Sequence, residues 1–456
     1  MTQMNMTEST QDSQVRNTED QTIVIPEQVP ESASSGKTRF EDLGLPSEIL
    51  AATKELGFEY CTPIQEAILS QVIDGGDAAG QSQTGTGKSA AFLISIMTRL
   101  LRQNTSGKIK TGSPRALILA PTRELVCQIE KDAKGLARFS SLAVTSAYGG
   151  ISSKEQRKQF TGKQVDILVA TPGRLMDFMR QKVIRLDEVQ TLVIDEADRM
   201  LDMGFIPDIR NIVHSTPPKS SRQTLFFSAT MTPEVIRLSE QWTNEPVRVK
   251  VQAEQMTADS LEQIVYMVTV KEKFTLLYNL INQHYFERSI VFCNRKDETL
   301  KLYRKLYEHG ISCAMLSGDV PQYKRMKRLE DFRAGKYKVL VATDVAGRGI
   351  HIDGISHVIN FHLPEEPENY VHRIGRTARA GASGVSVSFA DEQEAFSLMD
   401  IEEYIEAKLP CIRPPEELLS PLPPVTKKST PYKKTRRKNK PRRYSSSQET
   451  RSAHTR

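Results

Sequence analysis

The feature of this sequence that most constrains its fold is a set of short apolar runs that are continuous rather than alternating in polarity. Stretches with helical periodicity lie between them. The runs occupy residues 116–120, 166–170, 192–195, 224–228, 290–293, 339–342 and 357–361. Strands covered by helices on both faces carry such runs, whereas half-exposed strands alternate polar and apolar residues. The pattern therefore predicts an α/β protein with doubly wound parallel sheets.

The runs fall into two groups, which predicts two tandem domains at residues 37–248 and 263–409, joined by a linker at 249–262. Residues 1–36 are rich in Thr, Ser, Gln and Glu and show no periodicity. Residues 410–456 begin with closely spaced prolines and continue into paired Lys and Arg. Neither composition buries a core, so both tails are predicted to be disordered.

The net charge of +6 hides an asymmetry along the chain. Residues 1–35 hold six acids and one base, whereas residues 426–456 hold twelve Lys and Arg and one acid. The body between them is therefore close to neutral. A basic tail of this kind predicts a polyanionic partner, and a merely solubilising extension is the alternative.

The five cysteines are far apart and form no CxxC pair. This disfavours a metal cluster or a disulfide framework and favours a reducing compartment. No apolar run approaches the roughly 20 residues that a membrane-spanning helix needs, and no signal peptide begins the sequence. We therefore expect a cytoplasmic protein without membrane association.

A loop at residues 82–89 precedes a helical stretch and has the composition of a phosphate-binding loop. Its glycines let backbone N–H groups face an anion, and the helix start adds positive dipole. Lys88 is expected on the β and γ phosphates, with the Ser89 hydroxyl on Mg²⁺. An ordinary turn before a core helix is the alternative. The expected ATP-binding residues of this loop are Ser82, Gln83, Thr84, Gly85, Thr86, Gly87, Lys88 and Ser89.

An apolar run ends in three acids within four residues, Asp195, Glu196 and Asp198. Such a cluster is costly to bury unless cations compensate it, and Mg²⁺ on a nucleotide is the natural compensator. Asp195 is expected to hold the metal through water, and Glu196 to orient and deprotonate the attacking water. An acidic helix cap is the alternative, although it needs only one of these acids.

Arg376 and Arg379 stand three residues apart, so both can point one way from a helix or tight turn. Arginine suits the charge that builds on a transferring phosphoryl group. A solvated basic face is the alternative for an isolated pair. The neighbouring His372, Gly375 and Thr377 favour a built catalytic site.

Taken together and in this order, the motifs resemble those of the DEAD-box RNA helicases of helicase superfamily 2. The matching segments are Phe40 and residues 57–65, 82–89, 121–125, 149–150, 171–174, 195–198, 228–230, 290–294, 317–325, 342–349 and 372–379. The resemblance implies two RecA-like domains, the first of them ATP-binding. It also implies RNA-stimulated ATP hydrolysis coupled to local unwinding of short RNA duplexes.

The resemblance also implies roles for single residues. Phe58, preceded by the isolated aromatic Phe40, is expected to stack on adenine, and Gln65 to bond its Hoogsteen edge. Asp344 is expected at the domain interface near the nucleotide, and the two arginines as fingers from the second domain. Coupling between nucleotide state and domain closure is expected from Asp198, Ser228, Thr230 and His372. Backbone contacts to RNA are expected from Arg123, Gly150, Thr171, Arg174, Arg295, Gly318, Arg325 and Thr343.

Three positions depart from the commonest family pattern. Ser82 replaces a small Ala, Ala378 replaces a Gly between the two arginines, and His351 stands where most members have Asp. The His substitution and the basic tail resemble the bacterial RhlB-type subgroup. That resemblance implies a role in RNA decay and a partner in the endoribonuclease E assembly, the degradosome scaffold.

Three other functions fit parts of the sequence. An ATP-gated RNA clamp or assembly platform needs the same motifs, with unwinding incidental. A DNA helicase or translocase of the same superfamily fits less well because of the Asp-Glu-Ala-Asp spelling and the adenine-reading segment. A nucleotide-binding protein without catalysis is disfavoured by the intact Lys88, Glu196, Arg376 and Arg379.

Overall fold

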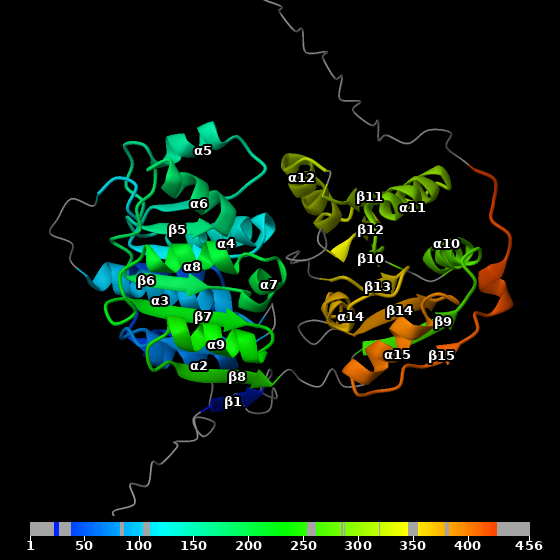
Figure 1. Ribbon diagram of the computed structural model, residues 1–456, viewed down its shortest axis with the longest axis horizontal. Coiled ribbons are helices and arrows are strands. Elements are labelled where there is room, and N and C mark those ends of the chain that lie inside the picture. Colours follow the sequence, from blue (N-terminus) through cyan, green and yellow to red (C-terminus); the bar gives the residue numbers. More distant parts are fainter. Residues whose placement is uncertain are drawn as a thin grey trace, which may run out of the picture.

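Two parallel sheets, each covered by helices on both faces, lie side by side in the computed structural model (Figure 1). The structure describes residues 22–26, 38–82, 86–103, 110–252, 261–283, 286, 288–318, 320–344, 354–378 and 383–425. This architecture confirms the predicted fold class of two RecA-like α/β domains. No described helix is long and apolar enough to cross a membrane.

The first domain is built on a sheet of strand order β1-β8-β2-β7-β6-β3-β5-β4. Its strands are β1 (Thr22–Pro26), β2 (Ala78–Gln81), β3 (Ala116–Leu119), β4 (Val144–Ala147), β5 (Ile167–Ala170), β6 (Thr191–Ile194), β7 (Gln223–Ser228) and β8 (Val247–Gln252). Its helices are η3 (Phe40–Leu43), α1 (Ser47–Glu55), α2 (Pro63–Val72), α3 (Lys88–Arg102), α4 (Arg123–Leu136), α5 (Ser153–Phe160), α6 (Pro172–Arg180), α7 (Ala197–Asp202), α8 (Ile206–His214) and α9 (Pro233–Trp242).

The second domain repeats the plan with strand order β11-β12-β10-β13-β14-β9-β15. Its strands are β9 (Leu261–Met267), β10 (Ser289–Phe292), β11 (Cys313–Leu316), β12 (Val339–Ala342), β13 (His357–Asn360), β14 (Gly384–Ala390) and β15 (Cys411–Ile412). Its helices are α10 (Lys273–Gln283), α11 (Lys296–Glu308), α12 (Gln322–Arg333), α14 (Pro367–Ile374), α15 (Ala395–Tyr404) and η4 (Glu416–Leu419).

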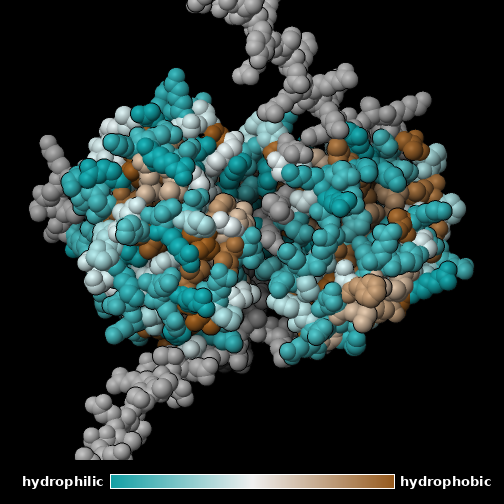
Figure 2. All heavy atoms as spheres, viewed as in Figure 1, coloured by the Kyte–Doolittle hydropathy of each residue, from teal (hydrophilic) through white to brown (hydrophobic). Residues whose placement is uncertain are grey.

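Burial on both sheet faces explains the continuous apolar runs. In β3, Leu117 and Ile118 are both fully buried although they point to opposite faces. Leu117 joins the core on one face of the sheet, and Ile118 joins the core on the other. Each such side chain contributes about 1.5–3 kcal/mol. The face of the two domains seen in Figure 2 is largely hydrophilic, with hydrophobic side chains gathered in a few places.

Regular structure reaches further into the predicted tails and linker than expected. Residues 22–26 form β1, which pairs in parallel with β8 from Thr22 opposite Arg248 onwards. A short β-branched run suits this exposed sheet edge, although the surrounding composition is polar. The strand β8 itself extends to Gln252, inside the predicted linker.

The start of the predicted basic tail is also ordered against the second domain. Residues 411–412 form β15 on β9, and the turn η4 buries Leu418. The amide of Asn279 donates hydrogen bonds to the backbone oxygens of Leu418 and Ser420, at 2.9 and 3.0 Å. The spaced prolines therefore belong to a strap across the domain rather than to a free arm. The exact domain limits stay a prediction.

Candidate active site and nucleic-acid interface

The phosphate loop connects β2 to α3, and its last residues are tightly constrained. Gly87 has φ of +93°, and a Cβ there would lie 2.7 Å from Nε2 of Gln65, so only glycine fits. The backbone N of Ser82 donates to Ser228 O at 3.0 Å, which fixes the start of the loop to β7. Thr86 O accepts from the Thr62 hydroxyl at 3.0 Å. Gln83, Thr84 and Gly85 lie outside the described residues.

Lys88 begins α3 and is directed at the acidic end of β6. Its side chain is 3% exposed. Its Nζ lies 3.3 Å from Ser82 O and 3.4 Å from Oδ1 of Asp195. The next residue, Ser89, lines the same cavity as Lys88 and Asp195. A buried ammonium between the loop and a carboxylate is well placed to meet the terminal phosphates of a nucleotide.

Asp195 follows β6 directly and is fully buried. Burial raises the pKa of its carboxyl group despite the positive charge of Lys88. Its Oδ1 accepts from the backbone N of Glu196 at 3.0 Å, whereas its Oδ2 is buried without a hydrogen-bond partner among the described residues. Buried polar atoms normally have a hydrogen-bond partner, so this oxygen is suited to bind a water molecule or a metal ion.

These observations fit a Mg²⁺ ion held mainly through water and phosphate oxygens. Within the described part of the chain, no group of three His, Cys, Asp or Glu side chains forms a cage for a metal. Mg²⁺ keeps several waters and is commonly bound by one or two carboxylates together with substrate phosphates. Asp195 and the Ser89 hydroxyl are the protein groups that would hold it.

Glu196 adopts a left-handed backbone conformation, with φ of +56° and ψ of +53°. This conformation costs a non-glycine residue about 1–2 kcal/mol, and strained residues cluster at functional sites. Arg199 holds the carboxylate through an Nη1–Oε2 contact of 2.9 Å. Burial alone would raise the pKa of Glu196, but the positive charges of Arg199, Lys88 and Arg376 outweigh it and lower the pKa. The carboxylate is therefore ionised near neutral pH, as a general base must be.

A cavity of about 690 Å³ extends from Asp195 and Lys88 towards the segment expected to read adenine. Gln65 is 5% exposed, and its Oε1 accepts from Thr62 N at 2.8 Å while its Nε2 donates to Gly87 O at 3.1 Å. Phe40 and Phe58 stack with ring centroids 6.2 Å apart, and both line the cavity. Leu56 and Tyr60 also line it, although neither was among the expected ATP-binding residues; Tyr60 lies inside the segment 57–65, and Leu56 directly precedes it.

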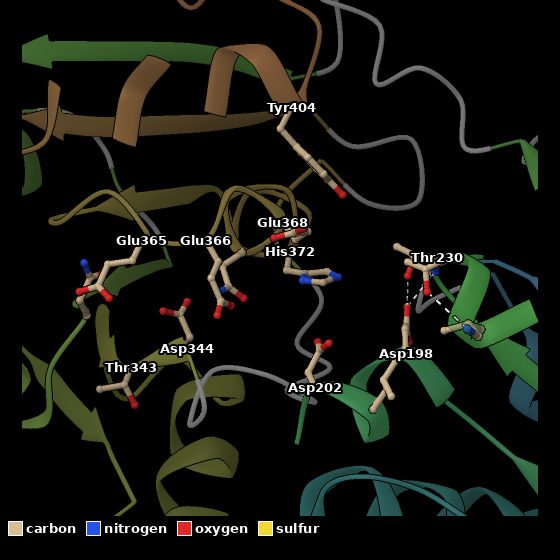
Figure 3. Close-up of a pocket in the computed structure, with 15 residues that line it drawn as sticks. Asp198, Asp202, Thr230, Thr343, Asp344, Glu365, Glu366, Glu368, His372 and Tyr404 are labelled. Carbon is tan, nitrogen blue, oxygen red and sulfur yellow. Dashed lines mark hydrogen bonds between the residues drawn. The ribbon is translucent and has the colours of Figure 1, made fainter. Parts of the chain in front are cut away.

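Three of the residues expected to couple nucleotide state to domain closure, Asp198, Ser228 and Thr230, form one hydrogen-bonded unit. Oδ2 of Asp198 accepts from Thr230 N at 2.8 Å, from Thr230 Oγ1 at 3.0 Å and from Ala229 N at 3.1 Å. The backbone N of Asp198 donates to Ser228 Oγ at 3.2 Å. His372 of the second domain points towards this unit across the boundary between the domains (Figure 3).

Arg376 brings a positive charge from the second domain to the first. It is 9% exposed and lines a small cavity together with Lys88, Glu196 and His372. Its Nε donates to His372 O at 3.1 Å, which anchors it to the end of α14. Arg379 lies outside the described residues, as does His351. Ala378, which replaces the usual Gly, has φ of +54°, a conformation that favours glycine.

A cavity of about 780 Å³ lies between the domains, and Asp344 lines it. The carboxylate of Asp344 is already hydrogen-bonded within the second domain. Arg373 donates to Oδ1 at 2.6 Å and to Oδ2 at 2.7 Å. The same guanidinium donates to Oδ1 of Asn294 at 2.8 Å and to His362 O at 2.7 Å. Arg373 is 1% exposed and was missed in the sequence, although it lies inside the arginine segment. It ties Asp344 to the loop after β10.

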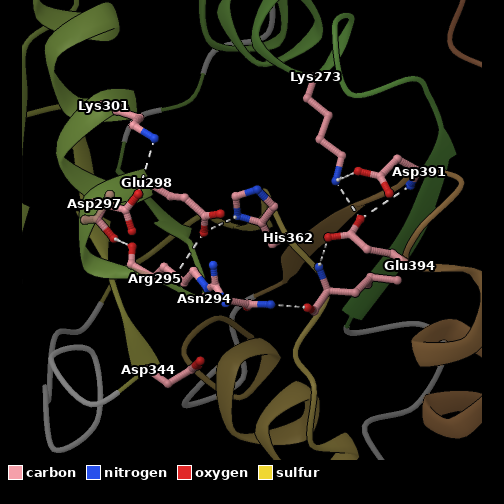
Figure 4. A network of polar contacts seen from close by, with 12 residues as sticks. Lys273, Asn294, Arg295, Asp297, Glu298, Lys301, Asp344, His362, Asp391 and Glu394 are labelled. Atoms are coloured by element: carbon pink, nitrogen blue, oxygen red, sulfur yellow. Dashed lines mark hydrogen bonds and ion pairs between the residues drawn. The ribbon is translucent and has the colours of Figure 1, made fainter.

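That loop belongs to a larger polar network in the second domain (Figure 4). Asn294 Nδ2 donates to Leu363 O at 2.8 Å, and Leu363 N donates to Glu394 at 3.2 Å. Glu394 in turn contacts Lys273 at 2.5 Å. The network therefore fixes the loop that precedes Arg295, one of the expected RNA contacts.

The expected RNA contacts of the first domain cluster around the start of α4 and the loop after β4. The Arg123 guanidinium packs on Gly149 and Gly150, and a Cβ on Gly150 would overlap it. Arg174 donates to Ile151 O at 3.1 Å. Thr171 is 8% exposed and precedes α6, whose cap it forms.

The residues of the second domain that are expected to contact RNA differ in exposure and in their contacts. Arg295 and Gly318 are exposed, and the Lys296 ammonium lies beside Gly318. Thr343 is 5% exposed and lines the cavity between the domains. Arg325 pairs with Oε1 of Glu124 in the first domain at 3.1 Å, so it bridges the domains in this structure.

Two family sequence patterns match the chain. The DEAD/DEAH box helicase pattern matches residues 62–238, and the helicase conserved C-terminal domain pattern matches residues 272–381. The chain is 55% identical over 388 residues to the ATP-dependent RNA helicase RhlB of Pseudomonas putida, covering 85% of this chain and 98% of that one. It is 46% identical to the protein of the same name in Xanthomonas axonopodis, covering 84% and 67%.

Solved structures of two further proteins resemble the fold. One is S. cerevisiae Dbp5 bound to RNA and ADP BeF3, with a TM-score of 0.71, 29% identity, and coverage of 82% of this chain and 95% of that one. The other is Mss116p bound to single-stranded RNA and AMP-PNP, with a TM-score of 0.74, 26% identity, and coverage of 87% and 83%.

Proposed function

The chain belongs to the DEAD-box family of ATP-dependent RNA helicases, and we propose that it couples RNA-stimulated ATP hydrolysis to local separation of short RNA duplexes. The observation that carries the proposal is the position of Arg376 and His372. Both reach the first domain's catalytic carboxylates from the second domain. A site divided in this way works only while the domains are together.

Each half of the site has a distinct task in hydrolysis. Lys88 and the loop backbone hold the terminal phosphates, and Gln65 with Phe58 selects adenine. Glu196, ionised and held by Arg199, takes the proton of the attacking water. Arg376 compensates the charge that builds on the transferring phosphoryl group. Bound Mg²⁺ supplies further neutralisation of phosphate charge.

RNA provides the coupling because its contacts are also divided between the domains. Arg123, Gly150 and Arg174 lie on the first domain, and Arg295 and Gly318 on the second. These groups suit phosphates and 2′-hydroxyls rather than base edges, which predicts little sequence specificity. A strand bound to both halves holds the domains closed, and its bent path excludes a regular duplex. ATP hydrolysis then releases the strand.

The proposal is tested by ATP hydrolysis with and without single-stranded RNA, for the wild type and Glu196→Gln. We expect RNA to stimulate the wild type, and the variant to bind ATP but hydrolyse it very slowly. Glu130→Gln is the matched control, since Glu130 bonds Lys134 and Ser146 away from the site. A wild type without RNA stimulation would refute the proposal. An active Glu196→Gln variant would refute the role of Glu196.

An ATP-gated RNA clamp is the second candidate, favoured by the contact of Glu124 with Arg325 and Gln322 across the domain boundary. A clamp keeps its RNA for as long as the nucleotide is intact. The two functions differ in a duplex-separation assay run beside the RNA dissociation rate with a non-hydrolysable nucleotide. Slow dissociation without duplex separation would establish the clamp.

The biological setting proposed here is RNA decay in the bacterial cytoplasm, with the endoribonuclease E assembly as partner. Its support is the identity to proteins named RhlB and an apolar surface on α15, where Phe396 is 78% and Met399 63% exposed. Hydrophobic side chains gather on that part of the second domain (Figure 2). Binding of purified endoribonuclease E by the wild type, and its loss in Phe396→Ser, would support this partner. Equal binding by both proteins would place the contact elsewhere.

A further inference from the structure

The helix α12 lies at the edge of the second domain that faces the first (Figure 1). Its first turn is anchored across the boundary. Gln322 Nε2 donates to Oε1 of Glu124 at 2.9 Å, and Nε of Arg325 lies 3.1 Å from the same oxygen. Glu124 directly follows Arg123, an expected RNA contact of the first domain. The start of α12 therefore stands where the two RNA-binding halves meet.

Tyr323 sits in this first turn and is 69% exposed. By comparison, Tyr60 and Tyr404 are 44% and 45% exposed. Its neighbours Gln322 and Arg325 turn towards the first domain, while Leu329 and Phe332 of the same helix are buried. The tyrosine ring is thus presented to solvent beside the domain boundary, where it packs against no core.

The surroundings of this ring are strongly basic. Between Gln322 and Leu329 the helix carries Lys324, Arg325, Lys327 and Arg328, and no acid. The Lys324 ammonium lies 5.8 Å from the centre of the Tyr323 ring. Lys327, four residues on, shares the helix face of Tyr323 and is also exposed. Lys296 adds a further ammonium beside the neighbouring Gly318.

We propose that Tyr323 is a stacking platform for one base of the bound single-stranded RNA, with Lys324 and Lys327 on the adjacent phosphates. The proposal rests on the proposed function, because it needs RNA to pass from the first domain to the second beside α12. Aromatic rings set in a basic surface bind single strands through base stacking and backbone charge. Since every base has a π face, the platform adds affinity without sequence preference.

The platform also adds a kind of contact that the other expected RNA-binding residues do not make. The other expected RNA contacts are Gly, Thr and Arg, which hold the backbone and leave the bases unrestrained. A base held on Tyr323 is unavailable for pairing at the point where the strand passes from the first domain to the second. Tyr323 therefore adds a base contact to the contacts that the other residues make with the RNA backbone.

The test uses the full-length protein, a non-hydrolysable ATP analogue and short oligoadenylates that carry one 2-aminopurine at successive positions. Affinity is read from fluorescence anisotropy and stacking from quenching of the 2-aminopurine. The variants are Tyr323→Ala, Tyr323→Phe and Lys327→Gln. Phe139→Ala serves as the control, because it removes another exposed aromatic ring, which follows the end of α4 opposite to Arg123 and Glu124. Thermal melting checks that all of them fold.

We expect Tyr323→Ala to bind about fivefold or more weakly and to lose the quenching at one position, with an unchanged salt dependence. Tyr323→Phe keeps the ring and should match the wild type, as should Phe139→Ala. Lys327→Gln should lower the salt slope by about one. Wild-type affinity of Tyr323→Ala, or equal losses in Tyr323→Ala and Tyr323→Phe, would overturn the platform alone. A wild type that binds no RNA would overturn the proposed function as well.

Discussion

Neutralising Glu124 should weaken domain closure without weakening either domain. Glu124 is 8% exposed, and its Oε1 accepts from Gln322 at 2.9 Å and meets Arg325 at 3.1 Å. Both partners belong to the other domain. Glu124→Gln keeps the shape of the side chain but removes its charge, so Arg325 stays buried at the boundary without its counter-charge.

The magnitude follows from the two contacts. A hydrogen bond to a charged group contributes about 1.5–3 kcal/mol, and a neutral one about 0.5–1.5 kcal/mol. Making the Gln322 hydrogen bond neutral costs about 1 kcal/mol, and losing the ion pair with Arg325 costs about 1–2 kcal/mol more, which gives about 2–3 kcal/mol in total. That corresponds to a closure equilibrium weaker by about 30- to 150-fold. Because the contacts form only when the domains meet, the free energy of unfolding of each domain should stay within about 0.5 kcal/mol of the wild type.

The assay is the RNA concentration that gives half-maximal ATP hydrolysis, measured beside urea denaturation. We expect a large rise in that concentration and little change in the denaturation midpoint. Glu130→Gln on the same helix is the control, since its partners Lys134 and Ser146 lie in the first domain. If Glu124→Gln leaves the RNA requirement unchanged, the contact does not stabilise the closed state and the reasoning is refuted.

Three further predictions concern the second domain and the tail. Lys273 is 1% exposed between Asp391 and Glu394, so Lys273→Met should destabilise the domain by about 3–5 kcal/mol, seen as a lower urea midpoint. Burial, with the nearby charge of Lys273, lowers the pKa of His362 to about 4 from 6.5. The unfolded chain therefore binds this proton first, and stability should fall as the pH falls from about 6.5 towards 4. The melting temperature of His362→Asn should lose part of that slope, and an equal slope in both proteins would contradict the assignment. Deleting residues 426–456 should weaken RNA binding and flatten its salt dependence while ATP hydrolysis at saturating RNA survives. Loss of that hydrolysis would show that the tail does more than add affinity for RNA.

The sequence predicted seven strands from continuous runs rich in β-branched or large apolar residues, and it missed strands that lack such a run, including the fully buried β11. Residues 116–120 and 339–342 read as strands because each position is covered by helices. The strand β2 was missed because Ala78, Ala79 and Gly80 carry no β-branched signal. A Cβ on Gly80 would lie 2.8 Å from the Phe227 ring, so close packing against β7 demands a small residue there.

The site was predictable where one short segment supplies all the groups. The Asp195–Asp198 cluster is such a segment, since its chemistry is written in adjacent residues. The contacts of Glu124 with Arg325 and of Asp344 with Arg373 were not predictable in the same way. Each joins segments far apart in the chain, and the side chain is satisfied by a partner that only the tertiary structure supplies. The family resemblance predicts that Arg325 contacts RNA. In this structure Arg325 pairs with Glu124 of the first domain, and its contact with RNA stays a prediction.

The most direct test of the divided site is single-turnover ATP hydrolysis at saturating RNA by Arg376→Gln and the wild type. Arg376 reaches Glu196 only from the second domain, whereas the cavity in which ATP is expected is lined by groups of the first. We therefore expect hydrolysis to slow by about 10³-fold or more while binding of a fluorescent ATP analogue stays close to the wild type. Hydrolysis within about tenfold of the wild type would contradict the account, because the first domain would then suffice for catalysis.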